Sequence, residues 1–301
     1  MAALQRNPTF RCHTIKPEVL LPCDENLYHN NTIPEPFSMA QFDAQVYDDE
    51  DRPFSSFTYR IDAVRILARV LAVAWTHEVH EDHMKAIDNA ITAWFHHLPD
   101  GQEQIDMLDF NDRTDELLFQ AHMLINYATM YLHFPRSDLV PALPAARDVI
   151  REKFLLPTSS QHMHALKPIS ASKCLDSLAS YPPSVRKHSP FFICCVVFSI
   201  IVQLSSCAAN LPDSYDKHWD QIKLIMVVLK TLGRIWGLAR ATLKKIKRMT
   251  VEVFHDVATY PEDQIDDSRD SGIGVSDTSV EIQLGELPRI DMLYWAGYEP
   301  T

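Results

Sequence analysis

The feature that most constrains this chain is a nearly uninterrupted apolar run from Phe191 to Leu204, broken by one serine and one glutamine. As a helix this run reaches about 21 Å, which is short of the roughly 30 Å hydrocarbon core of a bilayer. Extending it to Ala209 gives about 28 Å, but only by including further polar side chains. A helix that is apolar on all sides lies either in a membrane or at the centre of a large domain. We therefore predict a buried central helix over 190–209 and no association with a membrane.

Glycine is scarce, with 7 residues among 301. Because tight turns and hairpins depend on glycine, this scarcity argues against an all-β fold. Neither G-x-G-x-x-G nor G-x-x-x-x-G-K occurs in the chain, which removes the two commonest nucleotide-binding motifs. The composition and the recurrence of apolar residues every three or four positions predict an all-α fold, a bundle of about seven or more helices.

Two amphipathic helices are expected in the first third of the chain. The first begins after Ser55 or Ser56, since serine is a favourable N-cap, and the second ends at Pro99. The apolar positions of the first are Phe57, Ile61, Val64, Ala68, Leu71 and Trp75. Those of the second are Met84, Ile87, Ile91, Trp94, Phe95 and Leu98.

A third helix is sharply bounded at about 113–133. Asp112 is expected to cap it, Asp115 and Glu116 suit the positive end of the helix dipole, and Pro135 is expected to stop it.

Proline and glycine set the remaining boundaries. Residues 134–169 are rich in proline, so we expect only short helical pieces there and a short helix beginning at Ser170 or Ser172. A long apolar pattern follows from about 214 to 257, and Gly233 and Gly237 are expected to bend or split it. The apolar positions of this pattern are Ile222, Ile225, Met226, Leu229, Leu232, Trp236, Leu243 and Ile246.

Charge divides the chain into three expected parts. The net charge is −12, and residues 261–301 contribute −8 of it. We expect an irregular segment over 1–54, a helical domain over 55–260 and a flexible acidic tail over 261–301. Because nucleic-acid binding depends on Lys and Arg neutralising phosphates, we expect no direct DNA binding by this chain alone.

Six cysteines are scattered along the chain and never occur in C-x-x-C spacing: Cys12, Cys23, Cys174, Cys194, Cys195 and Cys207. A cluster of two zinc ions needs six thiolates, largely paired in the sequence, that share the metals. We therefore expect no cofactor in this chain, and zinc only where a six-cysteine cluster precedes it. The first residues lack the apolar region of a secretory signal, so we expect reduced thiols.

Several strings of the chain resemble the fungal-specific transcription factor domain, the regulatory region of many fungal zinc-cluster regulators. Along the chain they are 57–62, 94–99, 112–137, 188–204 and 229–236, which is the order expected for that family. The resemblance covers roughly 20–260 and implies an α-helical bundle in a nuclear regulator of transcription. It further implies that the protein regulates transcription by RNA polymerase II, with the genes of a metabolic cluster as a candidate target. In that family a separate zinc cluster binds the DNA. This chain departs from the family by lacking that cluster, so we expect a homodimer or a DNA-binding partner.

The strings that could bind a metal ion lack the residue spacing that the corresponding motifs require. The histidine-rich string 77–83 lacks the second histidine of H-E-x-x-H, so a polar helix end or loop is the better interpretation. The acidic string 48–51 and the string 111–114 are incomplete versions of the magnesium motifs of terpene synthases. Cys194 and Cys195 are expected in the core with a raised pKa, and His122 is expected to be a core histidine. We predict that the chain is not an enzyme. The open alternatives are a helical scaffold protein or an all-α enzyme of the terpene-synthase type.

Two segments are candidate interaction sites. Lys244, Lys245, Lys247 and Arg248 match the spacing of a nuclear import signal, although a basic run on a helix is more commonly a solvated face, here with Ile246 turned inward. In the acidic tail, apolar residues spaced as on one helix face are typical of an activation segment that folds on a coactivator or on the transcription machinery. These residues are Leu287, Ile290, Leu293, Tyr294 and Trp295.

Overall fold

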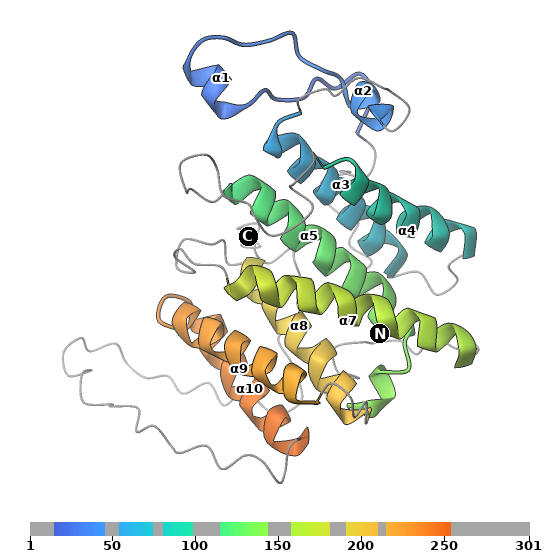
Figure 1. Ribbon diagram of the computed structural model, residues 1–301, viewed down its shortest axis with the longest axis vertical. Coiled ribbons are helices and arrows are strands. Elements are labelled where there is room, and N and C mark those ends of the chain that lie inside the picture. The colour runs from blue at the N-terminus through green and yellow to red at the C-terminus, as the bar shows by residue number, and fades with distance from the viewer. Residues whose placement is uncertain are drawn as a thin grey trace, which may run out of the picture.

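The computed structural model describes residues 15–45, 54–74, 81–98, 115–143, 158–180, 191–209 and 215–253. Within these ranges every regular element is a helix, and the only extended pairing is an isolated bridge between Leu20 and Ser38 (Figure 1). The predicted all-α class is therefore confirmed. The α-helices are α1 (Glu25–His29), α2 (Met39–Asp43), α3 (Ser56–Ala74), α4 (Glu81–His96), α5 (Glu116–His133), α7 (Thr158–Ser180), α8 (Phe191–Ala208), α9 (Tyr215–Leu232) and α10 (Gly237–Val253).

The long helices pack in layers that largely follow chain order (Figure 1). Helix α3 lies against α4 and α5, and α5 in turn packs against α7 and α8. Helices α9 and α10 pack on each other and cover α8. Two 3₁₀ turns, η3 (Phe134–Arg136) and η4 (Val140–Ala142), carry the chain away from the end of α5.

Helix α8 is the centre of the fold. It is long and apolar enough to cross a bilayer, yet 89% of it is buried inside the protein. Helices α5, α7, α9 and α10 surround it. The prediction of one fully buried central helix is confirmed, and the polar Ser199 and Gln203 are fully buried within it.

The cap that starts α3 is Ser55, one of the two predicted serines. The backbone N–H of Thr58 donates to Ser55 Oγ at 3.3 Å, as expected of an N-cap. Ser55 Oγ also donates to the carbonyl oxygen of Pro22 at 2.7 Å, which ties the start of α3 to the N-terminal segment.

The buried face of α3 is offset from the one predicted. Phe57 is 40% exposed, and Ile61, Val64 and Leu71 are only partly buried. The fully buried side chains are instead Thr58, Tyr59, Asp62, Ala63, Ile66, Leu67, Val70 and Val73. The buried face is offset because α3 contacts both α4 and α5. Asp62 can lie on this face because Arg65 Nε donates a hydrogen bond to Asp62 Oδ1 at 2.9 Å.

Helix α5 is capped one turn later than predicted. Asp115, not Asp112, accepts hydrogen bonds from the backbone N–H groups of Leu117 and Leu118, both at 3.0 Å. Asp112 lies outside the described residues. The predicted end near Pro135 is confirmed, because α5 passes there into η3.

The expectation of only short helical pieces before Ser170 is wrong. Helix α7 begins at Thr158 and continues through Pro168. A proline inside a helix removes one backbone hydrogen bond and clashes with the preceding turn. Packing against α5 and α8 compensates for this cost, since Ala165, Pro168 and Leu175 are buried there.

The predicted split of the long C-terminal pattern is confirmed between α9 and α10. A Cβ atom on Gly233 would meet the carbonyl oxygen of Leu229 at 3.1 Å and the Cα of Arg240 at 3.4 Å. The Arg240 guanidinium donates to the carbonyl oxygen of Gly233 from Nε at 3.2 Å and from Nη2 at 3.1 Å. Glycine thus permits the close approach, and Arg240 satisfies a carbonyl that the helix end leaves free.

Candidate functional site

The basic run lies on the outer face of α10. Lys244, Lys247 and Arg248 are exposed, and Lys245 is partly buried. Ile246 is 2% exposed, so the prediction that it points into the core is confirmed. These positions fit the solvated face that a basic run on a helix more commonly forms, and the import hypothesis is tested by the following substitutions.

Changing Lys244, Lys245, Lys247 and Arg248 together to alanine should leave nuclear accumulation of a fluorescent fusion unchanged. The reason is that Ile246 anchors this stretch in a folded helix, so the basic side chains form a solvated face. Circular dichroism should show an unchanged helix content. Exclusion of the folded variant from the nucleus would instead identify these residues as the import signal.

Most of the other candidate strings fall outside the residues that the structure describes. This holds for the tail residues Leu287, Ile290, Leu293, Tyr294 and Trp295, and for the strings 48–51, 77–80 and 111–114. Of the histidine-rich string, His83 is described and is exposed. In the described ranges, no three His, Cys, Asp or Glu side chains are grouped to hold a metal ion.

The predicted core positions of His122, Cys194 and Cys195 are confirmed. His122 is 4% exposed and lies edge-on to Trp94, with 5.0 Å between ring centroids. Burial raises the pKa of Cys194 to about 11 and that of Cys195 well above its ordinary value. Thiols held in this protonated form are poor nucleophiles, as the sequence predicts.

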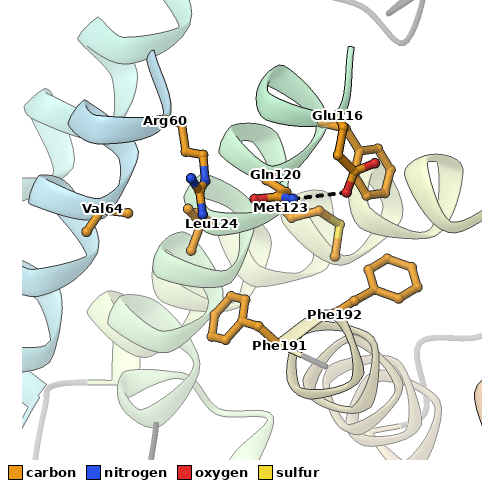
Figure 2. Close-up of a pocket in the computed structure, with 9 residues that line it drawn as sticks. Arg60, Val64, Glu116, Gln120, Met123, Leu124, Phe191 and Phe192 are labelled. Atoms are coloured by element: carbon orange, nitrogen blue, oxygen red, sulfur yellow. Dashed lines mark hydrogen bonds between the residues drawn. The ribbon is translucent and has the colours of Figure 1, made fainter. Parts of the chain in front are cut away.

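A pocket opens between α3, α5 and α8 (Figure 2). Its volume is about 150 Å³. The walls are mainly apolar, with Phe191 and Phe192 on one side and Arg60, Glu116 and Gln120 among the polar residues of the lining (Figure 2). The other lining residues are Val64, Phe119, Met123 and Leu124.

Arg60 is the cationic group of this pocket. Its Nε atom is buried and has no hydrogen-bond partner. The guanidinium carbon lies 5.9 Å from the centroid of the Phe57 ring, near the outer limit of a cation–π contact.

Two side-chain hydrogen bonds hold the polar side of the pocket in place. The Gln120 amide donates to Glu116 Oε1 at 3.0 Å, one turn along α5 (Figure 2). Ser56 Oγ donates to Asp115 Oδ2, the side chain that caps α5. The starts of α3 and α5, which carry Arg60 and Glu116, are thereby fixed to each other.

A second, polar pocket of about 400 Å³ lies on the far side of α3. Arg65 bridges Asp62 and Asp43 within it. Burial raises the pKa of Asp62 to about 6, and the nearby Arg65 opposes that rise. His97 also lines the pocket, and neither of its ring nitrogens has a hydrogen-bond partner.

A polar cluster joins α4, α5 and α7. His133 Nε2 donates to Asp88 Oδ1 at 3.0 Å, and Lys167 forms an ion pair with the other oxygen of Asp88. His133 Nδ1 therefore accepts from His164 Nδ1 at 2.8 Å. The hydrogen bond from His133 lowers the pKa of Asp88 to about 2, whereas burial lowers the pKa of His133 and brings that of His164 to about 4. His133 and His164, both neutral, thus form a chain of hydrogen bonds that connects Asp88 on α4 to α7.

A second buried cluster joins α7 to α8. Asp176 is 2% exposed and accepts hydrogen bonds from Ser199 Oγ at 2.8 Å and from the Gln203 amide. Burial raises the pKa of Asp176 to about 7, and the two hydrogen bonds oppose the rise only partly. Both clusters link one helix to another, which is a structural role.

The sequence pattern did not reveal these groups. One signal was present: Ser199 and Gln203, the two polar residues of the apolar run, are one helical turn apart and so share a face. Arg60 gave no such signal, because an arginine in an amphipathic helix is ordinarily solvent-exposed.

Most of this chain is similar to part of a curated protein, the C6 finger domain transcription factor iacK of Pestalotiopsis fici (strain W106-1 / CGMCC3.15140). The two are 28% identical over 262 residues, which is 84% of this chain and 38% of the relative. The chain therefore spans less than half the length of the curated relative it matches. No family model matches the chain, and no solved structure does either. What the comparisons support is thus a similarity to a fungal transcription factor.

Proposed function

We propose that this chain is the regulatory domain of a fungal transcription factor that acts in the nucleus on RNA polymerase II transcription. The observation that carries the proposal is the similarity over 84% of the chain to a protein named as a C6 finger domain transcription factor. In this proposal residues 55–260 form the regulatory helical domain, and its targets are the genes of a metabolic pathway.

The charge of the chain supports a division of labour between DNA binding and regulation. A net charge of −12 disfavours binding to phosphates, and none of the six cysteines has the C-x-x-C spacing of a zinc cluster. DNA contact would come from a six-cysteine zinc cluster elsewhere in a longer protein, from a DNA-binding partner or from a homodimer carrying such clusters. These 301 residues would regulate the activity of the transcription factor and would hold no cofactor.

The arrangement of the helices supports a binding role rather than a catalytic one. The polar clusters around Asp88 and Asp176 join helices to one another, while the pocket beside Arg60 is apolar and opens to the surface. The acidic tail, with Leu287 to Trp295, would contact coactivators or the transcription machinery.

A reporter assay tests the proposal. The 301-residue chain, fused to a heterologous DNA-binding domain in a fungal host, should change transcription of a reporter that carries the matching site. A matched fusion of residues 1–260 should lose activation if the tail supplies it. Reporter output equal to that of the DNA-binding domain alone, from a folded nuclear fusion, would contradict the proposal and favour a scaffold protein.

A further inference from the structure

We infer that the pocket between α3, α5 and α8 is a binding site for a small monocarboxylate with an apolar, single-ring body. This goes beyond the proposed function, because binding at this pocket does not depend on a role in transcription.

The size of the pocket sets the size of the ligand. An engineered cavity of about 150 Å³ lined by apolar side chains admits one benzene molecule. The pocket here has the same volume and similar walls, including Phe119, Met123, Phe191 and Phe192 (Figure 2). A single ring or a short branched alkyl group therefore fits.

Arg60 sets the charge of the ligand. Burying a donor without a partner costs free energy, and Arg60 Nε is such a donor. Within the described part of the chain, no carboxylate forms an ion pair with Arg60. A guanidinium presents Nε and one terminal nitrogen as a planar fork that matches the two oxygens of a carboxylate. A carboxylate in the pocket would pair with the Arg60 guanidinium, while its apolar body would contact the phenylalanine walls.

Glu116 limits the ligand to one negative charge. Its carboxylate lines the same pocket and is held there by the hydrogen bond from Gln120 at 3.0 Å (Figure 2). A second carboxylate on the ligand would be repelled by Glu116 at close range. The site therefore favours monocarboxylates over dicarboxylates and over neutral amides of the same shape.

Calorimetry on the 301-residue chain tests the inference with benzoate as the probe. Benzoate should bind roughly tenfold or more tightly than benzamide, its neutral isostere, because a charge-assisted hydrogen bond is stronger than a neutral one. Phthalate, with two carboxylates, should bind more weakly than benzoate. Arg60→Gln should remove the preference for benzoate over benzamide, whereas Arg69→Gln, a matched change on the same helix outside this pocket, should preserve it.

Two further measurements keep the test decisive. Without ligand, Arg60→Gln should unfold at the wild-type temperature or above it, because it removes a buried donor that lacks a partner. Val64→Phe, which fills the pocket and retains Arg60, should abolish benzoate binding. Equal affinities for benzoate and benzamide, or no binding of millimolar benzoate to the folded wild type, would overturn the inference.

Discussion

Replacing Asp176 with asparagine should make the protein more stable at pH 8 and remove part of its pH dependence. Asp176 is almost fully buried between α7 and α8 and has a pKa of about 7, against an ordinary value of 3.8. The unfolded chain therefore loses this proton at lower pH than the folded one, and the free energy of unfolding falls as the pH rises from about 4 to about 7. The difference amounts to a penalty on the order of 4 kcal/mol above pH 7.

Asparagine avoids that penalty and keeps the hydrogen bonds. Ser199 Oγ can donate to the new amide oxygen as it does to the carboxylate. Gln203 Oε1 has no partner in the structure, so rotating the Gln203 amide by half a turn lets it accept from the new amide nitrogen. The buried cluster thus keeps a hydrogen bond to Ser199 and one to Gln203 without a charge.

Thermal unfolding followed by circular dichroism between pH 5 and pH 8 measures the effect. The Asp176→Asn variant should gain most at pH 8 and less than half as much at pH 5. Asp220→Asn on the exposed side of α9 is the matched control and should change stability by less than about 0.5 kcal/mol. Equal stabilisation at both pH values would contradict a titrating Asp176.

Truncating Phe198 to alanine should destabilise the protein by about 3–5 kcal/mol. Phe198 is 1% exposed at the centre of α8. Its ring centroid lies 5.7 Å from that of Tyr127, 5.8 Å from Tyr131 and 5.5 Å from Phe134, so one side chain joins α8 to α5 and η3. Removing it leaves a cavity that these rings cannot fill together.

Denaturant unfolding of Phe198→Ala and of Val227→Ala measures this loss. Val227 lies on α9 and is 60% exposed, so its truncation should change the free energy of unfolding by less than about 0.5 kcal/mol. A loss of less than about 1 kcal/mol in Phe198→Ala would show that α8 is not the centre of the core.

The sequence predicted those elements whose local signals agree with their environment. Ile87, Ile91 and Trp94 recur at helical spacing and lie buried on α4, and α8 is buried on every side as its uniform apolarity requires. Gly233 marks the break between α9 and α10, where an added Cβ atom would crowd the carbonyl oxygen of Leu229 at 3.1 Å.

The same reasoning failed where a neighbouring helix overrides a local preference. Pro168 indicates a helix boundary when taken alone, but α5 and α8 hold α7 together around it. Thr58 and Asp62 indicate a polar face of α3, yet that face is buried because Ser55 and Arg65 supply their hydrogen bonds.

The sequence by itself determined the class of this protein: helical periodicity, few glycines and one helix that is apolar on every side leave an α-helical domain with that helix at its centre. Only the tertiary structure decided which polar groups meet. Asp176 finds Gln203 and Arg60 lines the pocket with Phe191 through helix packing, which brings together residues far apart in the chain. Periodicity records which side of a helix is apolar, but not which side chain of another helix lies opposite it.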